Sequence, residues 1–451
     1  MSSEAAKVLT CVEEGALEAL GLDEVTSSWC AANEFSGKAG QLLALPEPAT
    51  GKIGSYLFGL GQSDGRNPLL LGQASATLPK GDYRLEGLAG DSGQQCLGFL
   101  LGAYRFQLAG PESDTATLCD ESMPSSEILS LRDAAFLARD LINLPANLLG
   151  PDAYAARVLE YAEGHKMQAR EICGDDLLDE NFPMIHAVGR ASAQAPRLMD
   201  LSWGNPGDPK VTLVGKGVTF DTGGLDLKPA SAMALMKKDM GGSANILGLA
   251  HAIMANRLPV RLRVLVPIVE NAVSGSAFRP GDVLTSRKGI TVEIGNTDAE
   301  GRLILADALA LGAEERPQVM IDMATLTGAA RIAVGFELAA LFTASDALAD
   351  AMAVHGNLWG DPVWRMPLWQ NYAAGMKSKV ADINHIASSS YGGAIVAALF
   401  LEKFTEGAAE WAHLDISGWA LEARPGRTVG GTEAGIRAAY FALKDRFPPK
   451  S

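Results

Sequence analysis

Two carboxylates and a guanidinium stand at every second position of the segment NTDAEGRL, residues 296–303, as Asp298, Glu300 and Arg302. Carboxylates are preferred ligands of hard divalent cations. A planar guanidinium is suited to holding an anion through two parallel hydrogen bonds. The residue types and their spacing therefore indicate a site for a cation, an anion or both.

The flanking residues predict the elements that position these groups. Residues 290–294 are a β-branched run typical of a short strand, and residues 303–311 have the apolar spacing of a helix. We therefore expect the charged residues on a loop from a strand to a helix, where functional groups of α/β proteins collect. A simpler reading stays open, because a helix dipole favours acidic residues at any helix start.

A second charged cluster lies upstream, in LVGKGVTFDTGGLDLKP at 213–229 and KKDMGG at 237–242. Residues 211–214 predict a buried strand, residues 244–256 predict a helix, and the glycines at 215, 217, 223 and 224 allow sharp turns of the backbone. The second cluster contributes four charged residues, which are Lys216, Asp221, Lys228 and Asp239.

These residues favour a metal site over a phosphate loop. The Walker spacing is absent, and Asp221 would repel a phosphate unless a metal lay between them. Three aspartates and a glutamate at element ends can hold two divalent ions about 3.5 to 4 Å apart. The six histidines, at 165, 186, 251, 355, 385 and 413, show no HExxH spacing, and we expect His413 to be a packed residue rather than a ligand.

With these residues in place, the chain resembles the leucyl aminopeptidases, the cytosolic M17 metallopeptidases, whose hallmark is NTDAEGRL. The resemblance covers about residues 130–440 and includes VGKGVTFDTGGLDLKP, MKKDMGG, ARDLINLPAN at 138–147, ATLTGA at 324–329 and WAHLDISG at 411–418. It implies a metal-dependent aminopeptidase that releases Leu and other apolar residues from peptides with a free N-terminus.

The resemblance also implies a role for each charged residue. Asp221 and Glu300 would bridge two ions, Lys216 and Asp239 would complete the tighter site, and Asp298 would serve the exchangeable one. The tighter site would hold zinc, and the other would accept zinc, manganese or magnesium. Lys228 and Arg302 would be catalytic, with Arg302 holding a bicarbonate that acts as general base.

The implied chemistry suits these residue types. Two divalent ions lower the pKa of a bridging water, and a fixed ammonium such as that of Lys228 stabilises an oxyanion. Lys216 can ligate only when it is neutral, so we expect metal affinity to fall at low pH. The alternative for Lys216 is a salt bridge to Asp221 in a metal-free loop.

Matching to the family places seven residues around the first substrate pocket, and three nearby positions depart from the commoner pattern. Ser417 replaces Ala and Ala420 replaces Met, so the pocket should accept bulky side chains. Asp226 stands where related loops carry a smaller polar residue, and we expect it to face solvent rather than to weaken the field of Lys228. The seven pocket residues are Met236, Asn296, Thr325, Leu326, Gly328, Ser417 and Ala420.

The expected fold class is α/β with two domains. At 451 residues and 47% hydrophobic composition the chain has room for two or three domains. Residues 1–124 should form a small α/β domain, residues 125–144 a connecting helix with regular apolar spacing, and residues 145–451 the catalytic domain. The resemblance implies a mixed central sheet flanked by helices in that larger domain.

Composition also bears on partners and location. A net charge of −15 argues against nucleic acid, and five cysteines without CxxC spacing indicate reduced thiols. No run reaches the roughly 18 apolar residues of a membrane span, and the N-terminus lacks the features of a signal peptide. We therefore expect a cytoplasmic protein, which the resemblance implies is a homohexamer. An inactive assembly protein and a dimetal hydrolase of another amide or a phosphoester are the alternatives.

Overall fold

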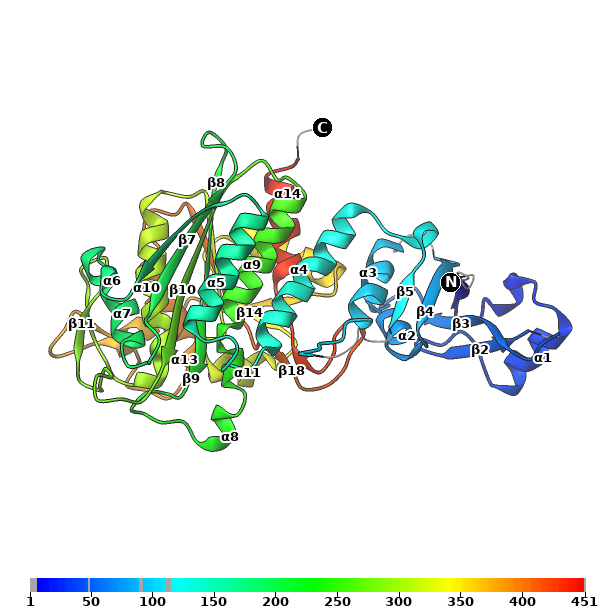
Figure 1. Ribbon diagram of the computed structural model, residues 1–451, viewed down its shortest axis with the longest axis horizontal. Helices are drawn as coiled ribbons and strands as arrows, with labels where there is room; N and C mark the ends of the chain where they lie inside the picture. The colour runs from blue at the N-terminus through cyan, green and yellow to red at the C-terminus, as the bar shows by residue number, and fades with distance from the viewer. Residues whose placement is uncertain (1–5, 48, 89–91, 110–114, 450–451) are drawn as a thin grey trace. The chain divides into compact units, whose positions relative to one another are not determined.

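The computed structural model describes residues 6–47, 49–88, 92–109 and 115–449 (Figure 1). The chain divides into two compact units. Unit 1 comprises Met1–Phe136, Leu358–Gly360 and Glu422–Val429. Unit 2 comprises Leu137–Asn357, Asp361–Leu421 and Gly430–Ser451.

Unit 1 is built on a five-stranded mixed sheet with the order β2-β3-β1-β4-β5. Only the β2–β3 pair is antiparallel among these neighbours. The strands are β1 (Lys7–Glu13), β2 (Leu42–Pro46), β3 (Ile53–Gly61), β4 (Gly81–Glu86) and β5 (Ala116–Leu118). The helical segments are η1 (Leu17–Leu20), α1 (Glu24–Ala32), α2 (Gly72–Thr77), α3 (Ser92–Gly102) and η2 (Asp120–Ser122).

A long helix, α4 (Ser126–Asn143), follows, where apolar spacing predicts a helix. Its buried residues Leu131, Ala134, Ala138 and Ile142 recur every three or four positions, so they form a single stripe.

Unit 2 contains a nine-stranded mixed sheet with the order β15-β14-β17-β13-β8-β10-β7-β6, and β9 pairs with β10 beside this path. The central strands β17, β13, β8 and β10 run parallel, whereas β14 and β7 are antiparallel to their inner neighbours. The strands are β6 (Gln168–Cys173), β7 (Arg197–Trp203), β8 (Lys210–Gly215), β9 (Gly217–Asp221), β10 (Arg261–Asn271), β13 (Val319–Ala324), β14 (Ala339–Thr343), β15 (Val363–Arg365) and β17 (Glu410–Asp415).

Helices cover both faces of this sheet, which confirms the expected mixed sheet flanked by helices (Figure 1). The helices of unit 2 are α5 (Pro151–Gly164), α6 (Asp176–Asp179), α7 (Pro183–Gly189), α8 (Ala230–Met233), α9 (Gly241–Ala255), α10 (Glu300–Glu314), α11 (Gly328–Val334), α12 (Asp346–Leu358), α13 (Gly393–Glu402) and α14 (Ile436–Arg446).

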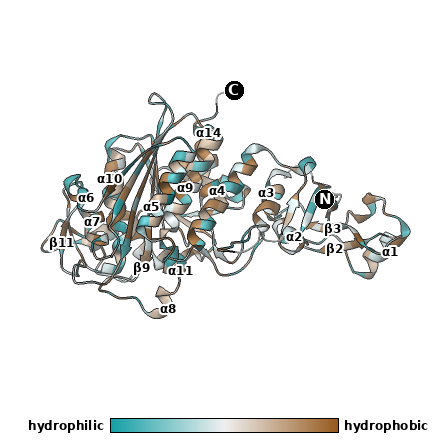
Figure 2. Cartoon of the chain, in the orientation of Figure 1, coloured by the Kyte–Doolittle hydropathy of each residue, from teal (hydrophilic) through white to brown (hydrophobic). Residues whose placement is uncertain are grey.

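The alternation of side chains along β8 shows which helices lie on which face of the sheet. Gly215 of β8 lies against Ser243 of α9, while Thr212 lies against Gly312 of α10. Residues an odd number of positions apart on a strand face opposite sides, so α9 and α10 cover opposite faces of the sheet. The strands between them are buried, and the brown of hydrophobic residues is prominent on this sheet in Figure 2.

Short elements complete unit 2. A three-stranded sheet contains β11 (Val283–Thr285), β12 (Thr291–Glu293) and β16 (Ile383–Asn384), and β18 (Trp419–Ala420) pairs with β19 (Gly430–Gly431). The 3-10 turns are η3 (Met236–Met240), η4 (Thr297–Ala299) and η5 (Gln370–Met376). In the described parts of the chain, no helix has both the length and the apolar character needed to cross a bilayer.

The helix predicted over 303–311 begins earlier than expected, at Glu300. Glu300 and Arg302 therefore lie in the first turn of α10, and Asp298 lies in η4, so the prediction of one irregular loop is wrong. The cause is a cap: Asn296 is extended, and its side-chain oxygen accepts a hydrogen bond from the Asp298 amide at 2.8 Å. Helical structure can therefore start directly after Asn296.

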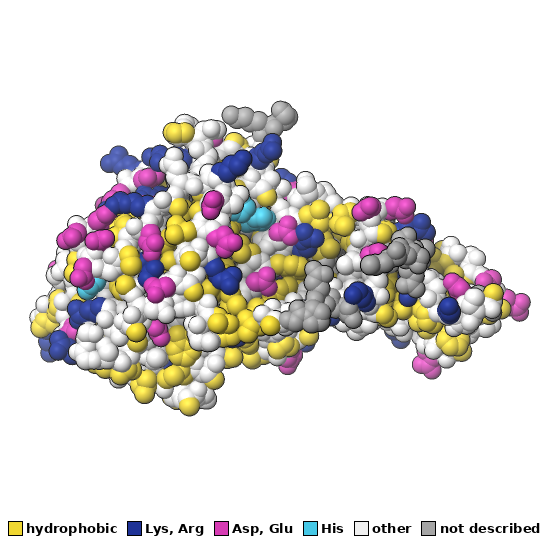
Figure 3. Space-filling view, in the orientation of Figure 1, with side chains coloured by type: hydrophobic (Ala, Val, Ile, Leu, Met, Phe, Trp, Pro, Cys, Tyr) yellow, Lys and Arg dark blue, Asp and Glu magenta, His cyan; other side chains and the backbone are white. Residues whose placement is uncertain are grey.

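The five cysteines are all free, as their number and spacing predict. Lysine and arginine side chains are scattered among acidic ones on the face of unit 2 that Figure 3 shows.

Candidate functional site

The glycines of the second cluster serve two different purposes. A Cβ on Gly215 would lie 2.4 Å from Ser243 Cα, and one on Gly217 would lie 2.4 Å from Pro267 O. Both lie in strands and permit close packing, so the turn expected at these two positions is wrong. Gly223 and Gly224, with φ of +88° and +65°, do form the sharp turn after β9.

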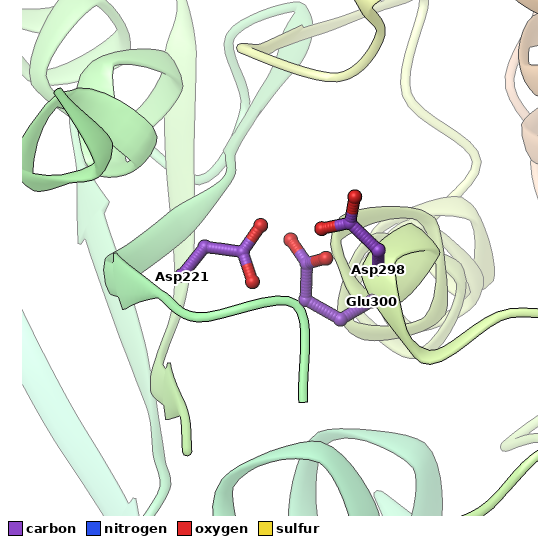
Figure 4. A group of neighbouring side chains, drawn as sticks. All are labelled: Asp221, Asp298 and Glu300. Carbon is purple, nitrogen blue, oxygen red and sulfur yellow. The ribbon is translucent and has the colours of Figure 1, made fainter. Parts of the chain in front are cut away.

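Three carboxylates from separate elements meet at the end of β9. Asp221 ends β9, Asp298 lies in η4 and Glu300 begins α10, and each offers an oxygen within 4.8 Å of the other two. Figure 4 shows the three carboxylates pointing toward one another. Asp221 and Glu300 are buried, so two of the three negative charges are withdrawn from water.

Two lysines lie against these carboxylates. Lys216 Nζ is 2.7 Å from Asp239 Oδ2 and 2.9 Å from Glu300 Oε1, so Asp239 of η3 joins the cluster through Lys216. Lys228 Nζ is 2.8 Å from Asp221 Oδ2 and also contacts Asp298 Oδ1. The salt bridge between Lys216 and Asp221 that the sequence left open is therefore replaced by bridges to Asp239 and Glu300.

Burial and crowding shift the pKa values of these groups. Burial, together with repulsion from Asp221, raises the pKa of the Glu300 carboxyl. Burial would by itself lower the pKa of Lys216, but the surrounding carboxylates, Asp239 and Glu300 first among them, outweigh it and raise that pKa. The cluster thus consists of closely spaced, mostly buried carboxylates, and additional positive charge would stabilise their ionised forms.

The oxygens of the cluster fit divalent metal ions. Asp239 Oδ2, Asp298 Oδ1 and Glu300 Oε1 are buried and accept no hydrogen bond of normal geometry from any residue that the structure describes. Each lies against a lysine ammonium instead. Charged oxygens buried without hydrogen bonds are costly, and carboxylate oxygens are the ligands that hard cations prefer.

Arg302 lies beside this cluster, and its guanidinium has a donor that no described residue uses. Its side chain is buried, Nη1 donates to the His385 carbonyl at 2.7 Å, and Nε has no hydrogen-bond partner among the described residues. Burial lowers the pKa of Arg302 to about 10, so the guanidinium remains cationic at neutral pH. An arginine with an unused buried donor fits the expected anion site.

His385 is a functional neighbour that the sequence analysis missed, because nothing in its spacing marks it. It is buried, its Nε2 lies 2.9 Å from Asn296 O, and its Nδ1 accepts a hydrogen bond from the Gly295 amide at 3.2 Å. Burial and the charge of Arg302 lower the pKa of His385 to about 3, so the ring is neutral and braces the turn before η4.

His413 is packed as expected. It is fully buried, and Nδ1 lies 2.6 Å from Asp322 Oδ1.

The segment ATLTGA contacts both sides of the cluster. Thr325 Oγ1 donates to Asp239 Oδ1 at 2.8 Å, and the Thr325 carbonyl accepts from Lys216 Nζ at 3.1 Å. The next turn is held by Asp415, which accepts from the Leu326 amide at 2.9 Å and from Thr327 Oγ1 at 2.6 Å. The sequence analysis did not single out Asp415, although it lies within WAHLDISG.

The remaining pocket residues are placed less directly. Ser417 is buried beside Gly418, whose Cβ position lies 3.1 Å from Thr325 Cγ2. For Met236, Gly328 and Ala420, the described residues show no hydrogen bond or ion pair to the carboxylates. The structure thus unites the seven metal and catalytic candidates and part of the predicted pocket.

Asp226 is exposed, as expected, but its carboxylate also makes a contact that the sequence did not predict. Although the residue is exposed, its Oδ2 accepts a hydrogen bond from the Thr297 amide at 2.7 Å. It therefore contacts the segment that carries Asp298.

Comparisons with known proteins match both parts of the chain to one family. The family model described as the cytosol aminopeptidase family, catalytic domain, matches residues 136–440, and that of the M17 aminopeptidase N-terminal domain matches residues 12–118. A probable cytosol aminopeptidase of Chlorobium limicola is 36% identical over 96% of this chain and 93% of its own length. One from a Geobacter species is 42% identical over 77% of this chain and 74% of its own.

Solved structures agree in fold. The crystal structure of a cytosol aminopeptidase from Coxiella burnetii superposes with a TM-score of 0.92 at 41% identity, covering 99% of this chain and 98% of that one. The bottromycin maturation enzyme BotP in complex with Mn superposes with a TM-score of 0.89 at 33% identity, covering 98% and 100%.

The fold and the site define the class of this protein as a metal-dependent exopeptidase that acts on peptides. The chain belongs to the cytosol aminopeptidase family, peptidase family M17.

Proposed function

We propose that the chain holds two divalent ions through Lys216, Asp221, Asp239, Asp298 and Glu300, with Asp221 and Glu300 shared by both. The observation that carries this proposal is a set of buried carboxylate oxygens that lie beside two lysines and accept no hydrogen bond from the described residues. Zinc or manganese, with magnesium at the exchangeable position, suits such donors. Two ions so held would supply a hydroxide nucleophile near neutral pH.

Lys228 and Arg302 carry out the remaining steps. The Lys228 ammonium lies against Asp221 and Asp298, where it can stabilise the oxyanion that forms from the peptide carbonyl. Arg302 Nε is buried and has no hydrogen-bond partner among the described residues, so Arg302 would hold a bicarbonate, which would supply a general base beside the cluster.

The release of a single N-terminal residue requires a free amino group on the substrate. We expect turnover of leucine amide and no turnover of N-acetyl-leucine amide, because acetylation removes the lone pair and the charge of that amine. A chelator should abolish turnover, and manganese or zinc should restore it. The measurement is amide hydrolysis with and without metal.

This assay also separates the alternative functions. Equal cleavage of blocked and free substrates would point to another amide hydrolase, and hydrolysis of phosphoesters alone would point to a phosphoesterase. No turnover of any substrate in the metal-loaded protein would identify an inactive binding protein.

The side-chain preference is expected to be broad and apolar. Ala420 stands where a methionine is common, and the smaller side chain leaves room in the pocket that Met236, Asn296, Thr325, Leu326, Gly328 and Ser417 complete. We expect phenylalanine and methionine amides to be turned over within about tenfold of leucine amide, because a pocket with room for the larger side chains does not exclude them sterically. Leucine turnover far above both would contradict this assignment.

The organisation and location of the protein remain predictions. We propose that residues 1–124 and 145–451 are separate domains joined by α4, that the chain forms a homohexamer, and that it works in the cytoplasm on peptides rather than on nucleic acid. The family membership of both parts of the chain supports the first of these.

A further inference from the structure

Two segments carry the groups that flank the carboxylate cluster. The first is the turn after β9, residues 221–228, which carries Asp221 and Lys228. The second is residues 296–300, which carry Asp298 and Glu300. We call them the lysine turn and the acidic turn. Whatever fixes one turn against the other sets the position of Lys228 relative to Asp298.

Thr297 is where the acidic turn meets the lysine turn. Its side chain is fully buried, and Oγ1 donates to the Gly223 carbonyl at 2.6 Å. The same Oγ1 accepts from the Asp226 amide at 2.8 Å. In return, the Thr297 amide donates to Asp226 Oδ2 at 2.7 Å. The two residues thus exchange hydrogen bonds through both main chain and side chain.

The helical geometry gives the Asp226 carboxylate a specific task. The first amides of a helical segment have no partner within the segment. In η4 and α10, the Asp298 amide is capped by Asn296 Oδ1 at 2.8 Å, and the Thr297 amide is capped by Asp226 Oδ2. A negative charge at this end of a helix also interacts favourably with the helix dipole. The lysine turn therefore supplies a cap that the acidic turn needs.

The lysine turn is itself closed. The Lys228 amide donates to the Thr222 carbonyl at 2.9 Å, and the Gly223 amide donates to Asp221 Oδ1 at 2.8 Å. Asp226 is two residues before Lys228, and Thr297 is adjacent to Asp298. A hydrogen bond between Asp226 and Thr297 therefore restrains the position of Lys228 relative to Asp298.

From these contacts we propose that Asp226 is a positioning residue that clasps the acidic turn to the lysine turn and so fixes Asp298 for metal binding. The consequence for the ion rests on the proposed function, whereas the clasp itself does not. Asp226 is exposed, so its replacement should leave the fold intact.

The test compares three proteins with the wild type. Asp226→Ala removes the acceptor, Asp226→Asn keeps an oxygen acceptor without the charge, and Asp350→Ala is a control on α12. Asp350 is exposed, and the structure shows no side-chain bond to it within the described residues. Melting temperatures close to that of the wild type establish that each variant folds.

The first readout is hydrogen exchange of peptides that cover residues 296–298, measured by mass spectrometry on the metal-free protein. We expect faster exchange in Asp226→Ala, because the Thr297 amide loses its acceptor, and near wild-type exchange in Asp226→Asn and Asp350→Ala. Wild-type exchange in Asp226→Ala would overturn the clasp.

The second readout is Mn²⁺ binding, measured by electron paramagnetic resonance of the free ion. We expect the weaker Mn²⁺ site of Asp226→Ala to lose about tenfold or more in affinity, as losses of outer partners do, with Asp226→Asn within about threefold of wild type. Equal losses in both variants would assign the effect to charge and overturn the proposal. Absence of Mn²⁺ binding by the wild type would instead refute the proposed function, while the exchange readout would still test the clasp.

Discussion

Replacement of Asp221 with asparagine is expected to lower kcat/KM for leucine amide by about 1,000-fold or more, or about 4 kcal/mol in transition-state stabilisation. The expected cause is loss of a shared metal ligand. Asp221 Oδ1 is already held by the Gly223 amide and by Asn271 Nδ2, both at 2.8 Å, which leaves Oδ2 facing Lys228 and the cluster. An amide would present a neutral group or an N–H donor there, and neither serves a cation as a carboxylate does.

Metal analysis gives the second measurement for Asp221→Asn. We expect the purified variant to hold fewer ions than the two proposed for the wild type after equal exposure to manganese. The matched control is Asp350→Asn, which makes the same chemical change on the exposed face of α12. Two bound ions together with wild-type activity in Asp221→Asn would remove Asp221 from the metal site.

Replacement of Lys228 with methionine is expected to lower kcat by about 100- to 1,000-fold, the usual effect of removing one oxyanion donor. The KM should change little, because the ammonium interacts with a charge that forms only in the transition state. The Lys228 side chain is 12% exposed and faces Asp221 and Asp298, so methionine can occupy its volume without its charge.

The metal content separates this role from a structural one. We expect Lys228→Met to keep both ions, because an ammonium is not a ligand and repels cations. The control is Lys379→Met, at an exposed lysine. Loss of ions to the same extent as in Asp221→Asn would show that Lys228 holds the site together, and a rise in KM alone would show a role in substrate binding.

Local patterns were enough to predict many elements of unit 2. The apolar spacing over 244–256 corresponds to α9, Gly241–Ala255, and the apolar run at 211–214 corresponds to β8, Lys210–Gly215. Spacing was less informative at the start of α10, because the Asn296 cap that begins helical structure is a single side-chain contact. The glycines at 215 and 217 were misread for a similar reason, since their neighbours Ser243 and Pro267 are distant in sequence.

The residues of the candidate site likewise divide into those that local patterns identified and those that they did not. Residue types and motifs identified the carboxylates, both lysines and Arg302, because each lies in a short segment with a recognisable chemical composition. Residue types and motifs did not identify His385 or Asp415. These two residues contact Asn296 and Leu326, which are distant in sequence, so no local spacing predicts the contacts.

The sequence by itself determined which chemical groups are present, namely four carboxylates, two lysines and an arginine in an α/β fold, and which family the chain resembles. Only the tertiary structure decided the pairings, in which Lys216 bridges Asp239 and Glu300, and Asp226 caps Thr297. The physical reason is that residue types and periodicity are local properties. These contacts join residues that are 23 to 84 positions apart, and they depend instead on the register of β8, β10 and β13 and on the packing of α9 and α10 against opposite faces of that sheet.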